Sequence, residues 1–254
     1  MAQLWSASER GDARAVAALL DGDRTSVAVN HAGEWGWTPL FVASERGHVE
    51  VVSTLLAKQE VNVNQAANNG CTPLYAASEK GHSEVVSLLL AKQGVDVNQA
   101  RDNGCTPLYV ASQEGHSEVV SMLLAKQGVD VNQAKNNGAT PLYVASWNGH
   151  SEVVSLLLAK QGVNVNQATN DGCTPLHIAS QNGHSEVVSM LLAKQGVDVN
   201  QAMNNGCTPL YIASQNGHSE VVSMLLAKQG VDVNHSPACS DASRVPSRRL
   251  RRST

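Results

Sequence analysis

Two short apolar stripes, each with the spacing of one helix face, recur along the chain, and residues 103–132 contain one complete set. The first stripe lies between Pro107 and Gly115. The threonine before the proline is able to accept a bond from a free helix N–H, and proline loses no bond at the first helical position. Glycine ends a helix well because it adopts the left-handed conformation. A short helix is therefore predicted, with an apolar face of Leu108, Val110 and Ala111.

A second helix is predicted directly after the first. The segment 116–118 begins it and places an acid in the first turn, where the helix dipole favours negative charge. Lys126 is expected in its last turn, and Gly128 is expected to end it. Its buried face comprises Val119, Val120, Met122, Leu123 and Leu124. The alternating segment 129–132 is too short for a helix and is predicted to be an extended arm.

The whole pattern repeats with a constant period of 34 residues. Thr-Pro-Leu begins at 38, 72, 106, 140, 174 and 208, and Asn103-Gly104 before one copy is a tight-turn dipeptide. A fixed period of this size indicates a stack of supersecondary units, each contacting only its neighbours. Such a stack presents a long surface rather than a buried active-site cleft.

Three motifs recur in register through residues 4–234: Gly-x-Thr-Pro-Leu, Ala-Ser-x-x-Gly-His, and Leu-Leu followed by Gly-Val-Asp-Val-Asn. Together they closely resemble the ankyrin repeat. The resemblance implies an all-α solenoid, in which helix-turn-helix units are stacked and joined by β-hairpin-like loops.

The chain departs from the family's pattern in three ways. The family's usual unit has about 33 residues, and we expect the extra residue here to lengthen or bulge the second helix near residues 91–93 and their equivalents. The family usually has histidine after Thr-Pro-Leu, which only His177 keeps; the others are Phe41, Tyr75, Tyr109, Tyr143 and Tyr211. The aspartate that usually opens the hairpin tip is replaced by Ala67, Arg101, Lys135, Thr169 and Met203.

Three segments are predicted. Residues 1–36 are predicted to form an N-terminal capping unit and linker, because charged residues allow the outer face of an end unit to contact water. Residues 37–234 read as six full repeats, and the polar, Arg-rich, non-periodic residues 235–254 as a disordered basic tail. The last repeat, 208–234, keeps the internal pattern. We therefore expect exposed apolar surface at that end, which favours self-association or docking of a further partner.

The net charge of −4 is spread unevenly. Five arginines and one aspartate give residues 235–254 a charge of +4, which leaves about −8 on the repeats. An acidic body argues against a nucleic-acid partner and favours basic ones. Neither a signal segment nor an apolar run of membrane-spanning length is visible, so no membrane association is expected. The predicted location is cytoplasmic, with a nuclear one open through the basic tail.

The chemistry-bearing residues recur once per unit, which favours structural roles. Cysteines 71, 105, 173 and 207 share one position, at a unit spacing of about 10 Å that is too long for disulfides, so free thiols are expected. A histidine column begins at His48 and recurs every 34 residues, too widely spaced to share a metal ion. We interpret these histidines as bonding backbone groups in the turn between helices. No catalytic site, metal or cofactor is predicted.

Positions that differ between near-identical units are not needed by the shared packing. They lie at the hairpin tips and at the ends of the first helices, regions that line the concave face in ankyrin-repeat proteins. Trp147 stands where other units carry Glu or Gln, which indicates a binding hot spot or, alternatively, a cover for a neighbouring apolar side chain. The predicted partner-binding residues are Glu79, Lys80, Arg101, Asp102, Gln113, Glu114, Lys135, Trp147, Asn148, Gln181, Asn182 and Met203.

The predicted function is a non-catalytic scaffold that binds another protein through the concave face. The sequence does not identify that protein. The alternative is a regulatory or targeting fragment of a larger multidomain enzyme, such as a ligase or kinase, whose catalytic domain lies outside this chain.

Overall fold

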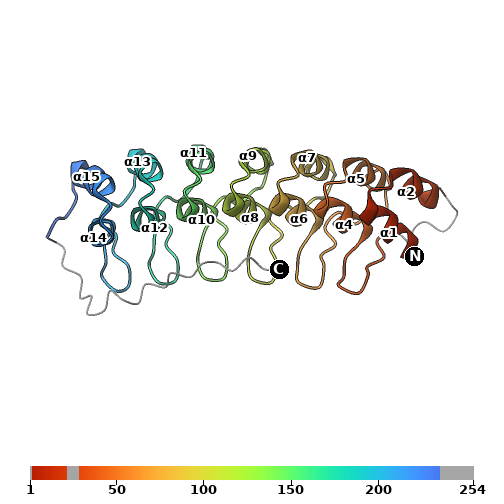
Figure 1. Cartoon of the computed structure of the whole chain (residues 1–254), viewed down its shortest axis with the longest axis horizontal. Helices are drawn as coiled ribbons and strands as arrows, with labels where there is room; N and C mark the ends of the chain where they lie inside the picture. The colour runs from red at the N-terminus through yellow and green to blue at the C-terminus, as the bar shows by residue number, and fades with distance from the viewer. Residues whose placement is uncertain (1, 22–28, 235–254) are drawn as a thin grey trace.

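The chain folds into an elongated stack of helix pairs (Figure 1). The computed structural model describes residues 2–21 and 29–234, and all its regular elements there are helices. Each unit has an inner helix followed by an outer helix. The inner helices are α1 (Ala2–Arg10), α4 (Pro39–Glu45), α6 (Pro73–Lys80), α8 (Pro107–Glu114), α10 (Pro141–Asn148), α12 (Pro175–Asn182) and α14 (Pro209–Gln215). The outer helices are α2 (Ala13–Leu20), α5 (Val49–Leu56), α7 (Ser83–Ala91), α9 (Ser117–Ala125), α11 (Ser151–Ala159), α13 (Ser185–Ala193) and α15 (Ser219–Ala227).

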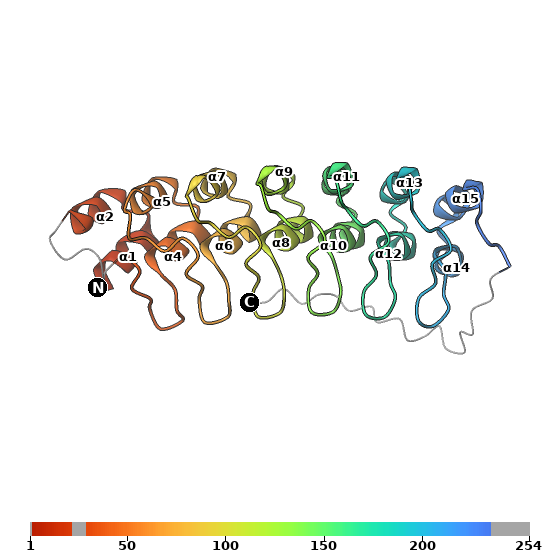
Figure 2. The ribbon, with the colours of Figure 1, turned by 180° about the vertical axis from the view of Figure 1, so that it is seen from behind.

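The inner and outer helices form two parallel rows. The loops project from the inner row on the side away from the outer helices, as views from opposite sides show (Figures 1 and 2). The predicted all-α solenoid is confirmed for the described residues. The predicted disordered tail, 235–254, and part of the predicted linker, 22–28, lie outside them.

The predicted helix signals act as expected. In α8, the Thr106 hydroxyl oxygen accepts a 3.1 Å bond from the Tyr109 N–H, and Pro107 occupies the first turn. Gly115 ends the helix in the left-handed conformation, with φ of 79°. The same threonine cap begins α4, α6, α10, α12 and α14.

The expected lengthening or bulge of the second helix is wrong. Helix α7 ends at Ala91, and Lys92 is already extended, with φ of −69° and ψ of 132°. A turn at residues 92–94 absorbs the added length. The same geometry leaves Lys126 just outside α9 rather than in its last turn. The ammonium group of the equivalent residue Lys92 binds the preceding unit, because its Nζ donates to the Leu56 carbonyl at 2.7 Å.

Two apolar layers hold each unit. The main core lies between the helix rows and contains fully buried leucines such as Leu108 and Leu123. A second layer lies between the inner helices and the loops, and it includes Cys105, Tyr109 and Val110. Tyr75, Tyr109 and Tyr143 therefore pack under the loops, at the position where the family usually has histidine.

The hairpin-like tips keep their hydrogen bonds without an opening aspartate. Arg101 N–H donates to the Cys105 carbonyl at 2.9 Å, and Gly104 N–H to the Arg101 carbonyl at 2.8 Å. Gly104 has φ of 83°, which requires glycine in practice. Neighbouring tips also bond to each other, because Asn136 N–H donates to the Asn103 carbonyl at 3.1 Å. These backbone bonds recur whatever the first side chain is, and a side-chain oxygen completes the tip: Asn103 Oδ1 accepts from the Cys105 N–H at 3.0 Å, and the Thr169 hydroxyl oxygen accepts from the Cys173 N–H at 3.1 Å.

Three ladders of hydrogen bonds, which we call the inter-unit ladders, join successive units. His116 Nε2 donates to the Glu79 carbonyl at 3.1 Å, and Lys126 Nζ donates to the Leu90 carbonyl at 2.6 Å. Asn98 bonds the next arm twice, through the Gly128 carbonyl at 2.7 Å and the Asp130 N–H at 2.9 Å. The histidines are structural, as expected, but they bond the preceding unit rather than groups in their own turn.

Candidate protein-interaction surface

One edge of the stack combines the hairpin tips with the C-terminal turns of the inner helices; we call it the tip–helix face. It carries all twelve residues predicted to bind a partner. The exposed members are Lys80, Asp102, Glu114, Asn148 and Asn182. The half-buried members are Glu79, Arg101, Gln113, Lys135, Trp147, Gln181 and Met203. The twelve residues therefore lie at the hairpin tips and at the ends of the inner helices, and not all of them are fully open to solvent.

Trp147 is half-buried at the C-terminal end of α10. Its indole ring packs edge-on against Tyr143, with 6.0 Å between ring centroids. It also contacts the apolar layer beneath the loops. The ring therefore covers a neighbouring apolar side chain and still presents part of its surface on the tip–helix face.

Arg101 and Lys135 lie over tyrosine rings on this face. The Arg101 guanidinium carbon is 5.2 Å from the Tyr75 ring centroid, and its Nη1 donates to the Tyr75 hydroxyl at 3.3 Å. Lys135 Nζ lies 5.8 Å from the Tyr109 centroid. Such cation–π contacts hold long basic side chains in place. Both cations are therefore held in defined positions on this face.

Burial keeps the cysteine and tyrosine side chains beneath this face in their neutral forms. It raises the pKa of the Cys71 thiol to about 11, chiefly through desolvation. It also raises the pKa values of Tyr75 and Tyr109. A reactive cysteine needs a lowered pKa and an accessible sulfur, and Cys71 has neither. Cys71 is therefore not activated as a nucleophile.

The asparagines at the ends of the inner helices have a structural bond that sequence reasoning missed. Asn148 Nδ2 donates to the Gln113 carbonyl at 2.9 Å, and His150 Nε2 donates to the same oxygen at 3.0 Å. Asn182 and His184 share the Trp147 carbonyl in the same way. The recurrence of Asn-Gly-His in the last three units was the available signal, since a repeated residue is typical of packing.

The side chains at the ends of the inner helices differ in charge between the first and the last units. The first units carry ionic side chains, including Glu79, Lys80 and Glu114, and an ion pair of 2.8 Å joins Arg46 to Glu9. The last three units carry uncharged side chains at the matching helix positions: Trp147, Asn148, Gln181, Asn182, Gln215 and Asn216. A partner that spans the inner-helix ends would meet charge at one end and amides with an aromatic ring at the other, whereas the tips of the later units still carry Lys135 and Asp171.

Comparisons with known proteins agree with this architecture. The family model described as "Ankyrin repeats (3 copies)" matches residues 4–101, 92–169 and 160–236. The chain belongs to the ankyrin-repeat family. A crystal structure of an ankyrin repeat protein, EF0377, is similar to it, with a TM-score of 0.70 and 25% sequence identity. The alignment covers 74% of this chain and 96% of that one. No curated protein matches the chain.

Ankyrin repeats generally serve as protein-interaction modules and are generally non-enzymatic. No helix in residues 2–21 and 29–234 is both long and apolar enough to span a membrane. Across the same residues, His, Cys, Asp and Glu side chains form no group of three able to hold a metal ion.

In this ankyrin stack, His177 is a buried titratable residue that joins two successive units by a hydrogen bond. Its Nε2 donates to the Cys207 carbonyl of the next unit at 3.0 Å, and its Nδ1 accepts from the Thr174 N–H at 3.3 Å. Both contacts fit the neutral ring with its proton on Nε2. Desolvation lowers the pKa of His177 to about 4.

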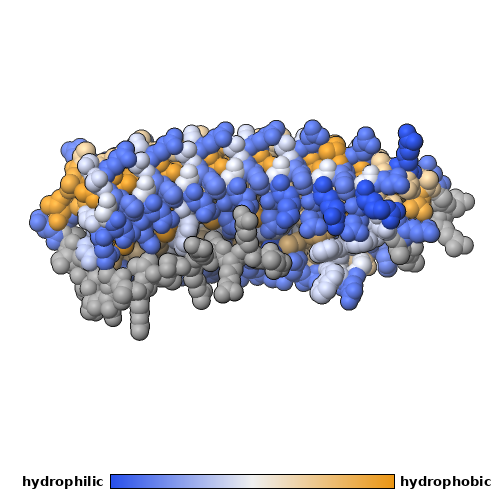
Figure 3. Space-filling model, in the orientation of Figure 1, coloured by the Kyte–Doolittle hydropathy of each residue, from blue (hydrophilic) through white to orange (hydrophobic). Residues whose placement is uncertain are grey.

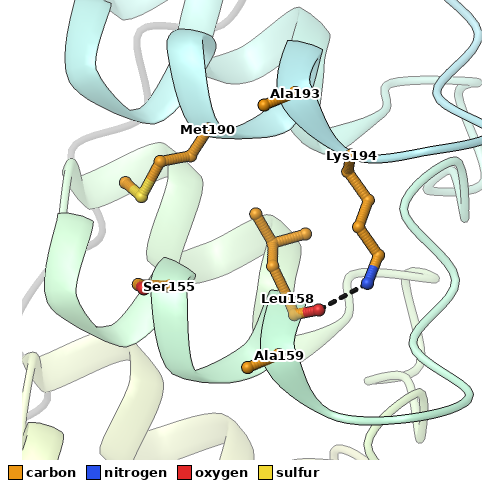
Figure 4. A pocket seen from close by; sticks show the side chains of 6 residues that line it. All are labelled: Ser155, Leu158, Ala159, Met190, Ala193 and Lys194. Atoms are coloured by element: carbon orange, nitrogen blue, oxygen red, sulfur yellow. Dashed lines mark hydrogen bonds between the residues drawn. The ribbon is translucent and has the colours of Figure 1, made fainter.

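The outer row of the ankyrin stack carries a shallow groove of about 310 Å³ between α11 and α13 (Figure 4). Lys194 Nζ lies at one end and donates to the Leu158 carbonyl at 2.5 Å. The lining comprises Ser155, Leu158, Ala159, Met190, Ala193 and Lys194. The lysine belongs to the inter-unit ladders, so this groove contributes packing and holds no convergent polar groups for catalysis.

Proposed function

We propose that this protein is a non-catalytic scaffold that binds another protein through the tip–helix face. The observation that carries the proposal is the half-exposed Trp147 ring, which stands in a row otherwise occupied by Glu and Gln. Tryptophan is enriched among residues that dominate binding energy. Its packing on Tyr143 supports a preorganised anchor, because little side-chain entropy remains to be lost.

The preorganised cations support the same face. Arg101 and Lys135 are held over tyrosine rings in the tips of two successive units. Arginine and aromatic residues are over-represented in interface centres. The proposed contact region therefore runs from the tips at Arg101 and Lys135 to the helix end at Trp147.

The test uses affinity purification of the full chain followed by mass spectrometry, and then quantitative binding to the recovered partner. Trp147→Gln introduces the residue that neighbouring units carry, so the fold is retained. We expect an affinity loss of at least about tenfold for this variant. Glu152→Gln on α11 is the matched control in the same unit and should bind like the unmodified chain. A partner that binds both variants equally, and also Arg101→Ala, would refute this face.

A further inference from the structure

The C-terminal end of the stack exposes apolar side chains that internal units bury. Leu226 on α15 is 49% exposed, whereas Leu192, its equivalent in the preceding unit, is 8% exposed. Leu210 and Val222 are partly exposed at the same end, whereas their equivalents Leu176 and Val188 are fully buried; we call this end the terminal face. Apolar side chains are visible at this end of the body in Figure 3. A contiguous apolar patch of this kind is typical of an interaction site.

The terminal face also repeats the polar pattern of the internal interfaces. Internally, a histidine of each next unit donates to the inner-helix carbonyl equivalent to Gln215, as His218 does to Gln181 at 2.9 Å. A lysine donates to the outer-helix carbonyl equivalent to Leu226, as Lys228 does to Leu192 at 2.7 Å. The carbonyls of Gln215 and Leu226 therefore stand at the two acceptor positions of the terminal face.

The third ladder continues in the same way. Asn200 bonds the following arm through the Gly230 carbonyl at 2.7 Å and the Asp232 N–H at 2.8 Å. Asn234 is the next residue in this series and is exposed. The terminal face thus carries the same groups as the internal interfaces between units: apolar side chains, two carbonyl acceptors, and an asparagine at the position that forms two bonds.

Two copies of this chain do not complement that pattern. A second terminal face does not supply these donors, because His218 and Lys228 already bond the Gln181 and Leu192 carbonyls of their own preceding unit, and a buried carbonyl without a donor is costly. The N-terminal unit of a second copy is also unsuitable, because Asp12 occupies its histidine position and would place a carboxylate against a carbonyl. The donors that fit are an imidazole and an ammonium group at ladder spacing.

We propose that the terminal face docks one further repeat unit of this type, carried by a partner chain. The unit must carry the Gly-His turn, the Ala-Lys-Gln-Gly segment after its outer helix, and the arm that follows. Residues 235–254 contain neither a Gly-His nor a Leu-Leu pair. This surface is separate from the tip–helix face, and its test is independent of the proposed function.

The test titrates the ¹⁵N-labelled full chain with a synthetic peptide of residues 201–234. We expect amide shift changes in α14 and α15, and at least about fivefold weaker binding for peptides carrying His218→Ala or Lys228→Ala, the effect of one lost hydrogen bond. Leu226→Glu in the labelled chain should abolish binding. Leu19→Glu is the matched control, because Leu19 is 39% exposed at the opposite end, and it should leave binding unchanged.

If the peptide does not fold, a second variant of the protein tests the same proposal. It repeats residues 201–234 directly after Asn234 within the full chain. Amide exchange in α15 should then slow to the rate of α13. Unchanged exchange in this extended chain, or peptide-induced shifts in α1 and α2 instead, would overturn the proposal. So would a dimer of the unmodified chain that sedimentation detects and that Leu226→Glu abolishes.

Discussion

His184 Nε2 lies 2.9 Å from the backbone carbonyl oxygen of Trp147 and donates a hydrogen bond to it. The bond joins the turn of one unit to the inner helix of the preceding one. It holds in place the backbone that carries the proposed binding residue. Stacking and the proposed partner recognition would therefore be coupled at this point, because the same helix end would serve both.

Removing this imidazole should destabilise the stack. We expect His184→Ala to lower the free energy of unfolding by about 1–2 kcal/mol, because the bond is lost and the ring leaves a gap beside Gly149. Asn182→Ala removes an exposed donor to the same carbonyl and should cost less than about 0.5 kcal/mol. Urea denaturation measures both, and equal losses would contradict the central role of the histidine.

The buried serine at the end of the inner-helix pattern should be dispensable for stability. The Ser112 hydroxyl is fully buried and has no hydrogen-bond partner, so Ser112→Ala should stabilise the protein by about 1 kcal/mol. Ser214, its equivalent in the last unit, is exposed and donates to the Leu210 carbonyl at 2.8 Å. Ser214→Ala should therefore change stability by less than about 0.5 kcal/mol. A loss of stability in Ser112→Ala, measured by thermal unfolding, would show that its hydroxyl is satisfied.

His177 should make the stability of the protein depend on pH. Its pKa falls from 6.5 to about 4 on folding, so the unfolded chain binds the proton first as the pH drops. The stabilisation is fully present above pH 6.5 and is lost as the pH falls through about 4, by up to about 3 kcal/mol. His177→Tyr introduces the residue of the other units and should remove this component. Urea unfolding at several pH values would refute the prediction if both proteins lose the same stability.

The last unit should open before the internal ones. Each unit is held by its neighbours. In α15, Leu226 is 49% exposed, whereas its equivalent Leu192 in α13 is only 8% exposed. Amide exchange should therefore be faster in α14 and α15 than in α8 and α9. Exchange resolved by residue measures the difference, and equal protection in the two units would rule out a weak terminal face.

Local signals in the sequence determined the helices, because their causes act over three or four residues. Thr106-Pro107 and Gly115 locate α8 correctly, since a cap bond and a left-handed glycine need no distant partner. The period then determined the stack, because identical apolar faces have to bury one another. The tip–helix face was likewise predictable in outline, from the positions where near-identical units differ.

Only the tertiary structure decided which groups meet across units. Lys126 was predicted to lie in the last turn of its helix, but it lies just beyond α9 and reaches the Leu90 carbonyl, 36 residues earlier in the chain. Trp147 was identified by its type, yet its half-buried packing on Tyr143 depends on how the loops lie over the inner helices. Such contacts depend on the rise and rotation from one unit to the next. Those quantities come from packing of whole helix faces, which no single motif encodes.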